Sequence, residues 1–295
     1  MKKLLFGLLM MILLTGLVAC SSNDSANETN DDNKANSNGE TISIGVTPWT
    51  STVPPTKIAS LILQDMGYEV EEVEAEAGNI YAGLSQGGLD VFMDSWFPNQ
   101  MHYVERYEDD IEAIAVSYDD ADSGLVVPTY MEDINDVGDL KGKEDLFDNV
   151  AYTIEEGDPA MENLQKVIEK YELDIEQVNS SEGAMLAQAE KLIAQDKPVL
   201  FYGWRPHSMF TKYDAKILTN EKVTEYFSGS SINVVVNKDL AEKAPEVYEF
   251  FENWSIPLDD VEEMIANIDD GADPEEEAQN WIDNNQDKVD EMLEK

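Results

Sequence analysis

The sequence beyond residue 40 predicts an α/β protein built from two lobes. Short apolar runs typical of strands alternate with segments whose apolar residues recur at helical spacing. This alternation occurs in two separate blocks, which extended apolar runs near Val126 and near Val234 connect. In open α/β sheets, ligands bind outside the carboxyl ends of the strands. We therefore expect two lobes, a hinge between them, and a ligand cleft where they meet.

The first block predicts a strand–helix repeat. Ile58, Leu61 and Ile62 recur at helical spacing, and Gly67 follows at a position where glycine commonly ends a helix. The next run, YEVEEV, is typical of a strand. In chain order we expect a strand at 42–46, a helix at 55–66, a strand at 68–73, a short helix at 80–86 and a strand at 89–93.

The second block repeats this order and is followed by a helical segment. From Leu240 onward the chain is expected to be mostly helical. Within the block we expect a strand at 149–154, helices at 159–171 and 183–195, and a strand at 198–202 that ends at Trp204.

Two largely apolar runs, 124–128 and 232–236, have the composition of strands buried on both faces. We interpret them as the crossings between the lobes. This interpretation places one lobe at 41–127 plus 232–295 and the other at 128–231.

The start of the chain resembles a lipoprotein signal peptide. Lys2 and Lys3 precede an apolar run at 4–18 that is too short for a comfortable membrane span. Cys20, the only cysteine, follows it. We expect residues 1–19 to be removed and Cys20 to carry a lipid, which would anchor the protein to the cell membrane on its extracytoplasmic face. The alternative is an ordinary secretory signal.

The segment 20–40 is rich in Ser, Asn and Asp and has no large apolar residue. Such a segment cannot bury a core, so we expect a disordered tether.

The composition excludes several classes of protein. With 62 acidic and 19 basic residues, the formal net charge is −43 at pH 7. A surface this acidic repels phosphate backbones, so we expect no nucleic-acid binding. A single cysteine permits neither a disulfide framework nor a cysteine-based metal site, and the two histidines lack a zinc-site spacing. We expect no metal and no cofactor.

Three tryptophans stand at the ends of apolar runs and beside a proline. Trp49 ends ISIGVTPW, Trp96 lies in VFMDSWFP and Trp204 lies in VLFYGWRPH. Proline disfavours continuation of a strand, so the three indoles are expected at strand ends, beside the cleft. Aromatic faces attract a quaternary ammonium group, which has no N–H for a hydrogen bond to select. We expect the three to form a cage for such a cation; core packing is the alternative.

Further candidate contacts lie near these segments. Tyr81, at the start of a predicted helix, is a candidate fourth wall of the cage. His102 and His207 each follow a Trp-x-Pro segment and could donate to a ligand carboxylate. A surface or capping role is the alternative for His207. The strand-to-helix turn at Gly157 and Asp158 could offer backbone N–H groups to the same carboxylate.

Nucleophile signatures such as Gly-x-Ser-x-Gly, Ser-x-x-Lys and phosphate-loop patterns are absent from the sequence. We therefore expect a binding protein and not an enzyme. An extracytoplasmic hydrolase of an amino-containing substrate and a purely structural surface lipoprotein are the alternatives from other classes.

Three longer motifs resemble the glycine betaine/proline betaine-binding lipoproteins of osmoprotectant ABC importers. They are DSWFPN at 94–99, GLVVPTYM at 124–131 and GWRPHSMF at 203–210. The resemblance covers nearly the whole chain after the tether and implies a type II periplasmic-binding-protein fold. It also implies a cage of three tryptophans, and docking onto a membrane permease with a cytoplasmic ATPase. We expect the protein to be a monomer.

The anionic end of the expected site departs from that family's pattern. The matching turn is Gly157-Asp158-Pro159-Ala160, in which the proline has no N–H to give and the aspartate would repel a carboxylate. The family's histidine position is occupied by Met101, with His102 one residue further on, and Ser208 replaces a second tryptophan. Glycine betaine is the expected ligand, and a choline- or carnitine-type ligand of the same fold is the alternative.

Overall fold

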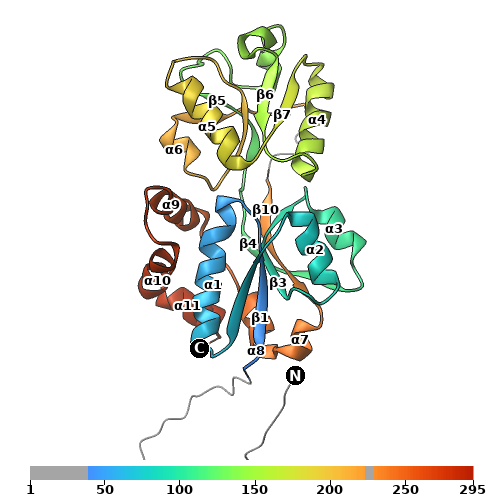
Figure 1. Ribbon diagram of the computed structural model, residues 1–295, viewed down its shortest axis with the longest axis vertical. Coiled ribbons are helices and arrows are strands. Elements are labelled where there is room, and N and C mark those ends of the chain that lie inside the picture. The colour runs from blue at the N-terminus through green and yellow to red at the C-terminus, as the bar shows by residue number, and fades with distance from the viewer. Residues whose placement is uncertain (1–38, 223–228, 295) are drawn as a thin grey trace, which may run out of the picture. The chain divides into compact units, whose positions relative to one another are not determined.

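The computed structural model describes residues 39–222 and 229–294, which contain two five-stranded mixed sheets (Figure 1). The first sheet has the order β2-β1-β3-β10-β4 and the second the order β7-β6-β8-β5-β9. We call the parts that carry them the first and second lobes. The first sheet consists of β1 (Thr41–Val46), β2 (Glu69–Glu74), β3 (Val91–Phe97), β4 (Ile111–Tyr118) and β10 (Ser231–Asn237). The second consists of β5 (Ser123–Pro128), β6 (Val150–Thr153), β7 (Glu176–Asn179), β8 (Phe201–Trp204) and β9 (Ala215–Ile217).

Helices cover both faces of the first sheet. Figure 1 shows α1 with the last helices of the chain on one side, and α2 with α3 on the other. In β10, Val234 and Val236 belong to the main core, whereas Val235 packs in a separate cluster with Ile80 and Tyr81 of α2. Successive strand residues point to opposite faces, so a strand covered on both sides is apolar at nearly every position. The helices of this lobe are α1 (Val53–Asp65), α2 (Ala77–Ser85), α3 (Met101–Arg106), α7 (Leu240–Lys243), α8 (Pro245–Glu252), α9 (Leu258–Asp269), α10 (Pro274–Asn284) and α11 (Gln286–Met292).

The second lobe repeats a strand–helix order. β6 pairs in parallel with β7 and β8, and β5 pairs antiparallel with β8 and β9. Each of the strands β6, β7 and β8 is followed by a helix: α4 (Pro159–Tyr171), α5 (Glu182–Ile193) and α6 (Met209–Lys212). The predicted α/β fold class is confirmed by this architecture.

The strand at 123–128 requires a correction of the expected lobe boundary. We expected the run 124–128 to cross between lobes and to end the first lobe at 127, but β5 pairs with β8 and β9 of the second sheet. Its apolar composition follows from burial inside that sheet. The run 232–236, which we expected to be the second crossing, is likewise part of a strand, β10 of the first sheet, so the chain crosses just before β5 and just before β10. At this point the Ala121 N–H donates a hydrogen bond of 3.0 Å to the Ser230 carbonyl, which joins the two crossings.

Several elements were not predicted, namely β4, β7, β9, α3 and α6. β4 and β9 are edge strands, and so is β7, whose sequence EQVN is polar. An edge strand pairs through its backbone on one side and faces water on the other, so its side chains need not form an apolar pattern.

The predicted signal peptide at 1–19, the lipid-modified Cys20 and nearly all of the 20–40 tether lie outside the described residues. Among the residues that are described, no helix combines the length and the apolarity needed to cross a membrane.

Gly67 ends α1 through a Schellman motif. Its φ is +92°, its N–H donates to the Gln64 carbonyl, and the Tyr68 N–H donates to the Leu63 carbonyl. These bonds satisfy carbonyls that the end of the helix would leave unpaired. The predicted helix stop at Gly67 is confirmed.

We predict that Gly67→Ala lowers the free energy of unfolding by about 1 kcal/mol, because a side chain is strained at this positive φ. Gly183→Ala, within α5 where an added Cβ meets nothing within 4 Å, should be neutral or stabilising by up to about 1 kcal/mol. Urea denaturation of both variants measures the difference. Equal effects in the two would contradict this account of the helix end.

Candidate functional site

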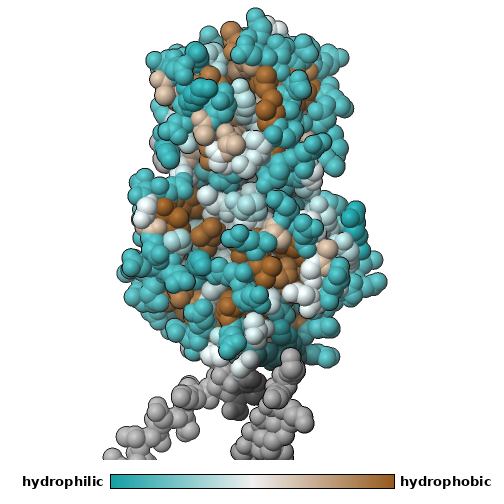
Figure 2. All heavy atoms as spheres, in the orientation of Figure 1, coloured by the Kyte–Doolittle hydropathy of each residue, from teal (hydrophilic) through white to brown (hydrophobic). Residues whose placement is uncertain are grey.

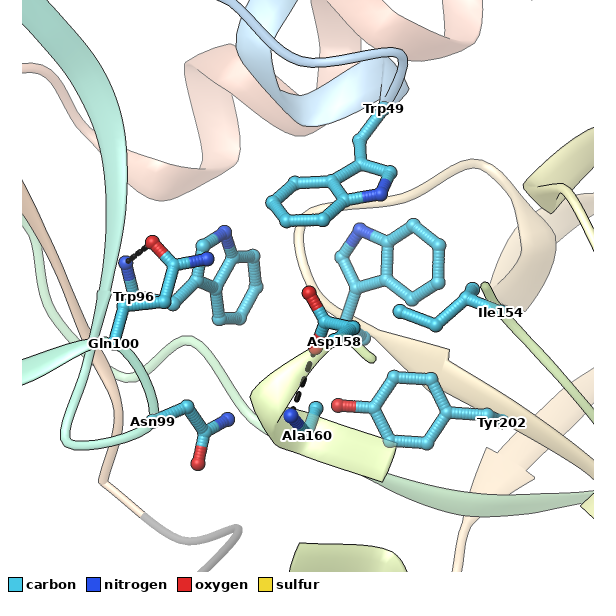
Figure 3. Close-up of a pocket in the computed structure, with 9 residues that line it drawn as sticks. Trp49, Trp96, Asn99, Gln100, Ile154, Asp158, Ala160 and Tyr202 are labelled. Carbon is cyan, nitrogen blue, oxygen red and sulfur yellow. Dashed lines mark hydrogen bonds between the residues drawn. The ribbon is translucent and has the colours of Figure 1, made fainter. Parts of the chain in front are cut away.

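Trp49, Trp96 and Trp204 line one cavity between the two sheets, which we call the tryptophan cavity. Trp49 follows β1, Trp96 lies near the end of β3 and Trp204 ends β8. Their side chains are only 6%, 7% and 4% exposed. The remaining lining residues are Asn99, Gln100, Ile154, Asp158, Ala160 and Tyr202, and Figure 3 shows them grouped around the indoles. Two indoles therefore come from the first lobe and one from the second.

Asp94 holds the Trp96 ring in place. The Trp96 indole N–H donates to Asp94 Oδ1 at 3.1 Å. The hydroxyls of Ser51 and Thr52, in the turn that follows Trp49, donate to Oδ2 at 2.9 and 2.8 Å. Asp94 is fully buried, so one carboxylate fixes the Trp96 ring relative to the turn that carries Trp49. Sequence reasoning missed this residue, although the separation of two between 94 and 96 places both side chains on one face of β3.

Burial raises the pKa of Asp94 to about 6, because an ionised carboxylate loses its hydration there. The hydrogen bonds from Thr52, Ser51 and Trp96 oppose this shift, whereas the negative charge of Glu182 adds to it.

Tyr81 lies behind the cavity and not in its wall. Its ring is fully buried between α2 and β3, where it stacks on Tyr103 with the ring centroids 4.7 Å apart. Its hydroxyl bonds to Ser95 and to Gln100 Oε1, and the same Gln100 oxygen accepts the Trp96 backbone N–H at 3.2 Å. The structure thus places Tyr81 as a support of Gln100, which does line the cavity.

Tyr202 is a wall residue that sequence reasoning missed. Its ring lies 5.9 Å from that of Trp204, and Figure 3 shows its hydroxyl directed towards Ala160. The signal was available in the sequence: residues 202 and 204 of one strand point to the same face.

The structure does not bring His102 and His207 into the cavity wall. His102 is exposed on α3, with Nδ1 3.1 Å from the Asn99 carbonyl. His207 is buried, and its ring meets Trp204 edge to face with the centroids 5.1 Å apart. Its Nδ1 accepts the Met209 N–H at 3.0 Å, and its Nε2 lies 3.2 Å from Glu182 Oε1. His207 therefore supports Trp204 and leaves no ring nitrogen for a ligand.

The start of α4 has no backbone N–H left for a ligand carboxylate. Asp158 is the N-cap, and its Oδ1 accepts the Ala160 N–H at 2.8 Å. The Met161 N–H donates to the Asp158 carbonyl at 2.9 Å, and Pro159 has none. Gly157 is exposed, with a φ of +96°, and does not line the cavity. Asp158 thus occupies the N–H groups at the start of α4, so this turn cannot bind a ligand carboxylate in the way that we expected.

Negative charge surrounds the cavity. Burial, with the charges of Glu155 and Glu76, raises the pKa of Asp158 to about 7, against the opposing effect of the hydrogen bond from the Ala160 N–H. Burial also raises the pKa of Glu155, with Glu76 and Glu182 adding to the shift and the Trp49 indole N–H opposing it. In the described part of the chain, the cavity wall contains one carboxylate and neither lysine nor arginine. An organic cation would relieve the repulsion among these groups.

Residues 40–284 match the family described as the substrate binding domain of ABC-type glycine betaine transport systems. The chain is 37% identical over 153 residues to the glycine betaine/carnitine transport binding protein GbuC of Listeria monocytogenes serotype 1/2a (strain 10403S). This match covers 50% of the chain and 51% of GbuC, so it spans about half the length of that relative.

Two solved structures resemble the chain over most of its length. Lactococcal OpuAC, in its closed-liganded conformation with glycine betaine, is 27% identical with a TM-score of 0.79, and the match covers 86% of this chain and 99% of that one. An ABC-transporter choline binding protein in complex with choline is 26% identical with a TM-score of 0.79, covering 87% and 92%. The type II periplasmic-binding-protein fold is confirmed.

We predict that ionisation of the Asp94 carboxyl group lowers the free energy of unfolding as the pH rises. Its pKa is raised from 3.8 to about 6, so the folded protein binds this proton more tightly than the unfolded chain. The resulting stabilisation is fully present below about pH 4 and is lost as the pH rises through about 6. Relative to Asp94→Asn, the wild type should therefore lose on the order of 1–3 kcal/mol of unfolding free energy between about pH 4 and pH 7.

Chemical denaturation across this range measures the effect, with the exposed Asp109→Asn as a control for the loss of one charge. A wild-type minus Asp94→Asn difference that stays constant with pH would contradict the raised pKa.

Proposed function

Because the chain belongs to the family of substrate-binding domains of ABC-type glycine betaine transport systems, we propose that it is the extracytoplasmic receptor of an importer for a quaternary ammonium compound. The family consists of transport binding proteins, so the chain is not an enzyme. The observation that carries the proposal is the meeting of three buried indoles at one cavity.

The chemistry of the cavity suits a trimethylammonium group. Such a group spreads its positive charge over methyl groups and has no N–H to donate, so hydrogen bonds cannot hold it and aromatic faces can. Each desolvated ring contributes up to about 2 kcal/mol, and three rings would supply most of the roughly 8 kcal/mol of a micromolar affinity. The Tyr202 ring beside Trp204 adds a fourth aromatic wall.

Lobe movement would govern ligand entry. The indoles are almost fully buried and come from both lobes, so a ligand cannot reach them unless the lobes separate. The joined crossings at Ala121 and Ser230 form the hinge in this proposal. The released ligand would pass to a membrane permease driven by a cytoplasmic ATPase. Cys20 at the end of the apolar run supports a lipid anchor that keeps the receptor beside that permease.

A choline-type ligand is a second candidate, because the helix start that was expected to receive a carboxylate has no N–H group left for one. The N–H groups at the start of α4 are taken, and Asp158 presents a carboxyl group to the cavity. Figure 3 shows one oxygen of Asp158 bonded to Ala160 and the other on the side of Trp49. A ligand hydroxyl could donate to that oxygen, whereas a ligand carboxylate would be repelled while Asp158 is ionised. Glycine betaine, the ligand of the OpuAC complex, remains the first candidate by family.

We predict that Trp204→Ala weakens binding of the ligand at least tenfold, because it removes one indole face from the cation. Isothermal titration calorimetry with glycine betaine and with choline measures the loss. Trp281→Ala removes an equally buried indole in α10, outside the cavity, and should leave affinity unchanged in protein that remains folded. Equal affinities of wild type and Trp204→Ala would eliminate the cage.

We further predict that pH distinguishes the two candidate ligands. A cation without a carboxylate favours ionised Asp158, whose pKa is about 7, so choline should bind up to about tenfold more tightly as the pH rises from 6 to 8. A carboxylate placed beside Asp158 favours the protonated form, so glycine betaine should bind more weakly over the same range.

The control is Asp158→Asn, since asparagine also caps helices well and does not titrate. Its affinity for either ligand should vary much less between pH 6 and 8, and the variation that remains should come from Asp94, whose pKa is about 6. A pH dependence that differs in neither sign nor size between the two ligands, or one that persists at full size in Asp158→Asn, would contradict the role given to Asp158.

A further inference from the structure

Glu182 is a buried carboxylate that contacts both lobes beside the tryptophan cavity. It is the first residue of α5 in the second lobe and is 7% exposed. Its Oε2 accepts the backbone N–H of Thr50 at 3.2 Å, and Thr50 directly follows Trp49 in the first lobe. Its Oε1 lies 3.2 Å from His207 Nε2, three residues after Trp204.

The two carboxylate oxygens of Glu182 accept from different lobes, one from Thr50 and the other from His207. The tautomer of His207 follows from the contact of its other ring nitrogen. Because Nδ1 of His207 accepts the Met209 N–H, the ring carries its proton on Nε2 and donates it to Glu182. The same ring packs edge-on against Trp204. One carboxylate therefore holds the residue next to Trp49 and the ring that supports Trp204.

Other contacts between the lobes are placed differently. Arg205 pairs with Glu262 of α9, Ser208 bonds to Asp269 at the end of the same helix, and Asn163 donates to Asn99 at 2.8 Å. The Arg205 side chain is 43% exposed, and exposed ion pairs contribute little. A buried carboxylate that loses one of its donors retains its desolvation penalty, so the Glu182 contacts should be the more sensitive ones.

We propose that Glu182 is the positioning residue that couples lobe closure to assembly of the tryptophan cavity. Closure brings the Thr50 N–H to a carboxylate that His207 already orients, and in the same movement it brings Trp49 to Trp204. Opening the lobes breaks the Thr50 bond and separates the two indoles. The proposal rests on the function proposed above, and it adds the residue that sets how long a bound ligand is retained.

Two variants disrupt the contacts of Glu182 with Thr50 and His207, which we call the latch, in different ways. In Glu182→Gln, the amide NH₂ must face either Thr50 or His207, both of which are donors, so one contact is lost along with the charge. Thr50→Pro removes the other partner and keeps the charge. Thr50 is the first residue of a 3-10 turn and follows Trp49 in an extended conformation with ψ of 145°, and both features suit a proline at this position.

The experiment is stopped-flow dissociation of glycine betaine and of choline from the full-length protein, followed by tryptophan fluorescence. For every ligand that the wild type binds, we expect the dissociation rate from either variant to be about tenfold higher or more. The association rate should change less. The two substitutions together should act less than additively, because both act on the hydrogen bonds of residue 182. Glu190→Gln, on the exposed face of α5, is the matched control and should match the wild type.

A second measurement does not need a ligand. Spin labels at Glu105→Cys on α3 and Lys170→Cys on α4, in a protein that also carries Cys20→Ser, report the distance between the lobes. This distance should be longer on average in Glu182→Gln and Thr50→Pro than in the wild type.

A loss of charge attraction alone would speed choline release without changing this distance, and that result would overturn the proposed role of the latch. Equal rates and distances in wild type and variants would also overturn it. A wild type that binds neither ligand would overturn the proposed function, and the distances would still decide the latch.

Discussion

In the proposed function the ligand is held by cation–π attraction, which is strong only when the aromatic faces are removed from water, and this constraint would organise the molecule. Three indoles that are almost fully buried cannot also be open to an arriving ligand. The structure meets both demands by dividing the indoles between two sheets. β1 and β3 of one sheet and β8 of the other end near this cavity, so the proposed site is complete only while the lobes lie together.

The second constraint is charge. Asp94, Asp158, Glu155 and Glu182 lie in or beside the cavity, and burial raises the pKa of the first three. The spacefilling view in Figure 2 shows a largely hydrophilic surface on both lobes, which agrees with the large excess of acidic residues. A cation entering this environment would stabilise the ionised carboxylates. Asp158 also caps α4 with its own side chain, so the dipole of that helix is already compensated and offers little to a ligand anion.

Much of the fold could be predicted from the sequence, because the buried strands and amphipathic helices carry clear periodic patterns. The helix at 159–171 was placed at its observed bounds, since Pro159 and the apolar spacing mark it. The role of the run at 124–128 could not be derived, because an apolar strand has the same composition wherever it is buried. The edge strands β4, β7 and β9 were missed, since the backbone pairing of an edge strand requires no apolar side-chain pattern.

For the candidate site, the three tryptophans were found because strand-end position and residue type coincide. Asp94 and Glu182 were not found, because their importance depends on partners far along the chain. Thr50 and Glu182 are 132 residues apart, and only the folded structure brings them together. The two histidines were misplaced for a related reason: proximity to a Trp-x-Pro segment does not fix the direction of a side chain, and His102 points to solvent while His207 faces Glu182.

The most direct test of the account uses tetramethylammonium, which has the cationic group and no other polar function. Nuclear magnetic resonance of the indole N–H groups can follow all five tryptophans of the chain during a titration. We predict saturable shifts for Trp49, Trp96 and Trp204, and unmoved signals for Trp254 and Trp281. Saturable binding that leaves the signals of the first three unchanged, or no binding at all, would contradict the central claim.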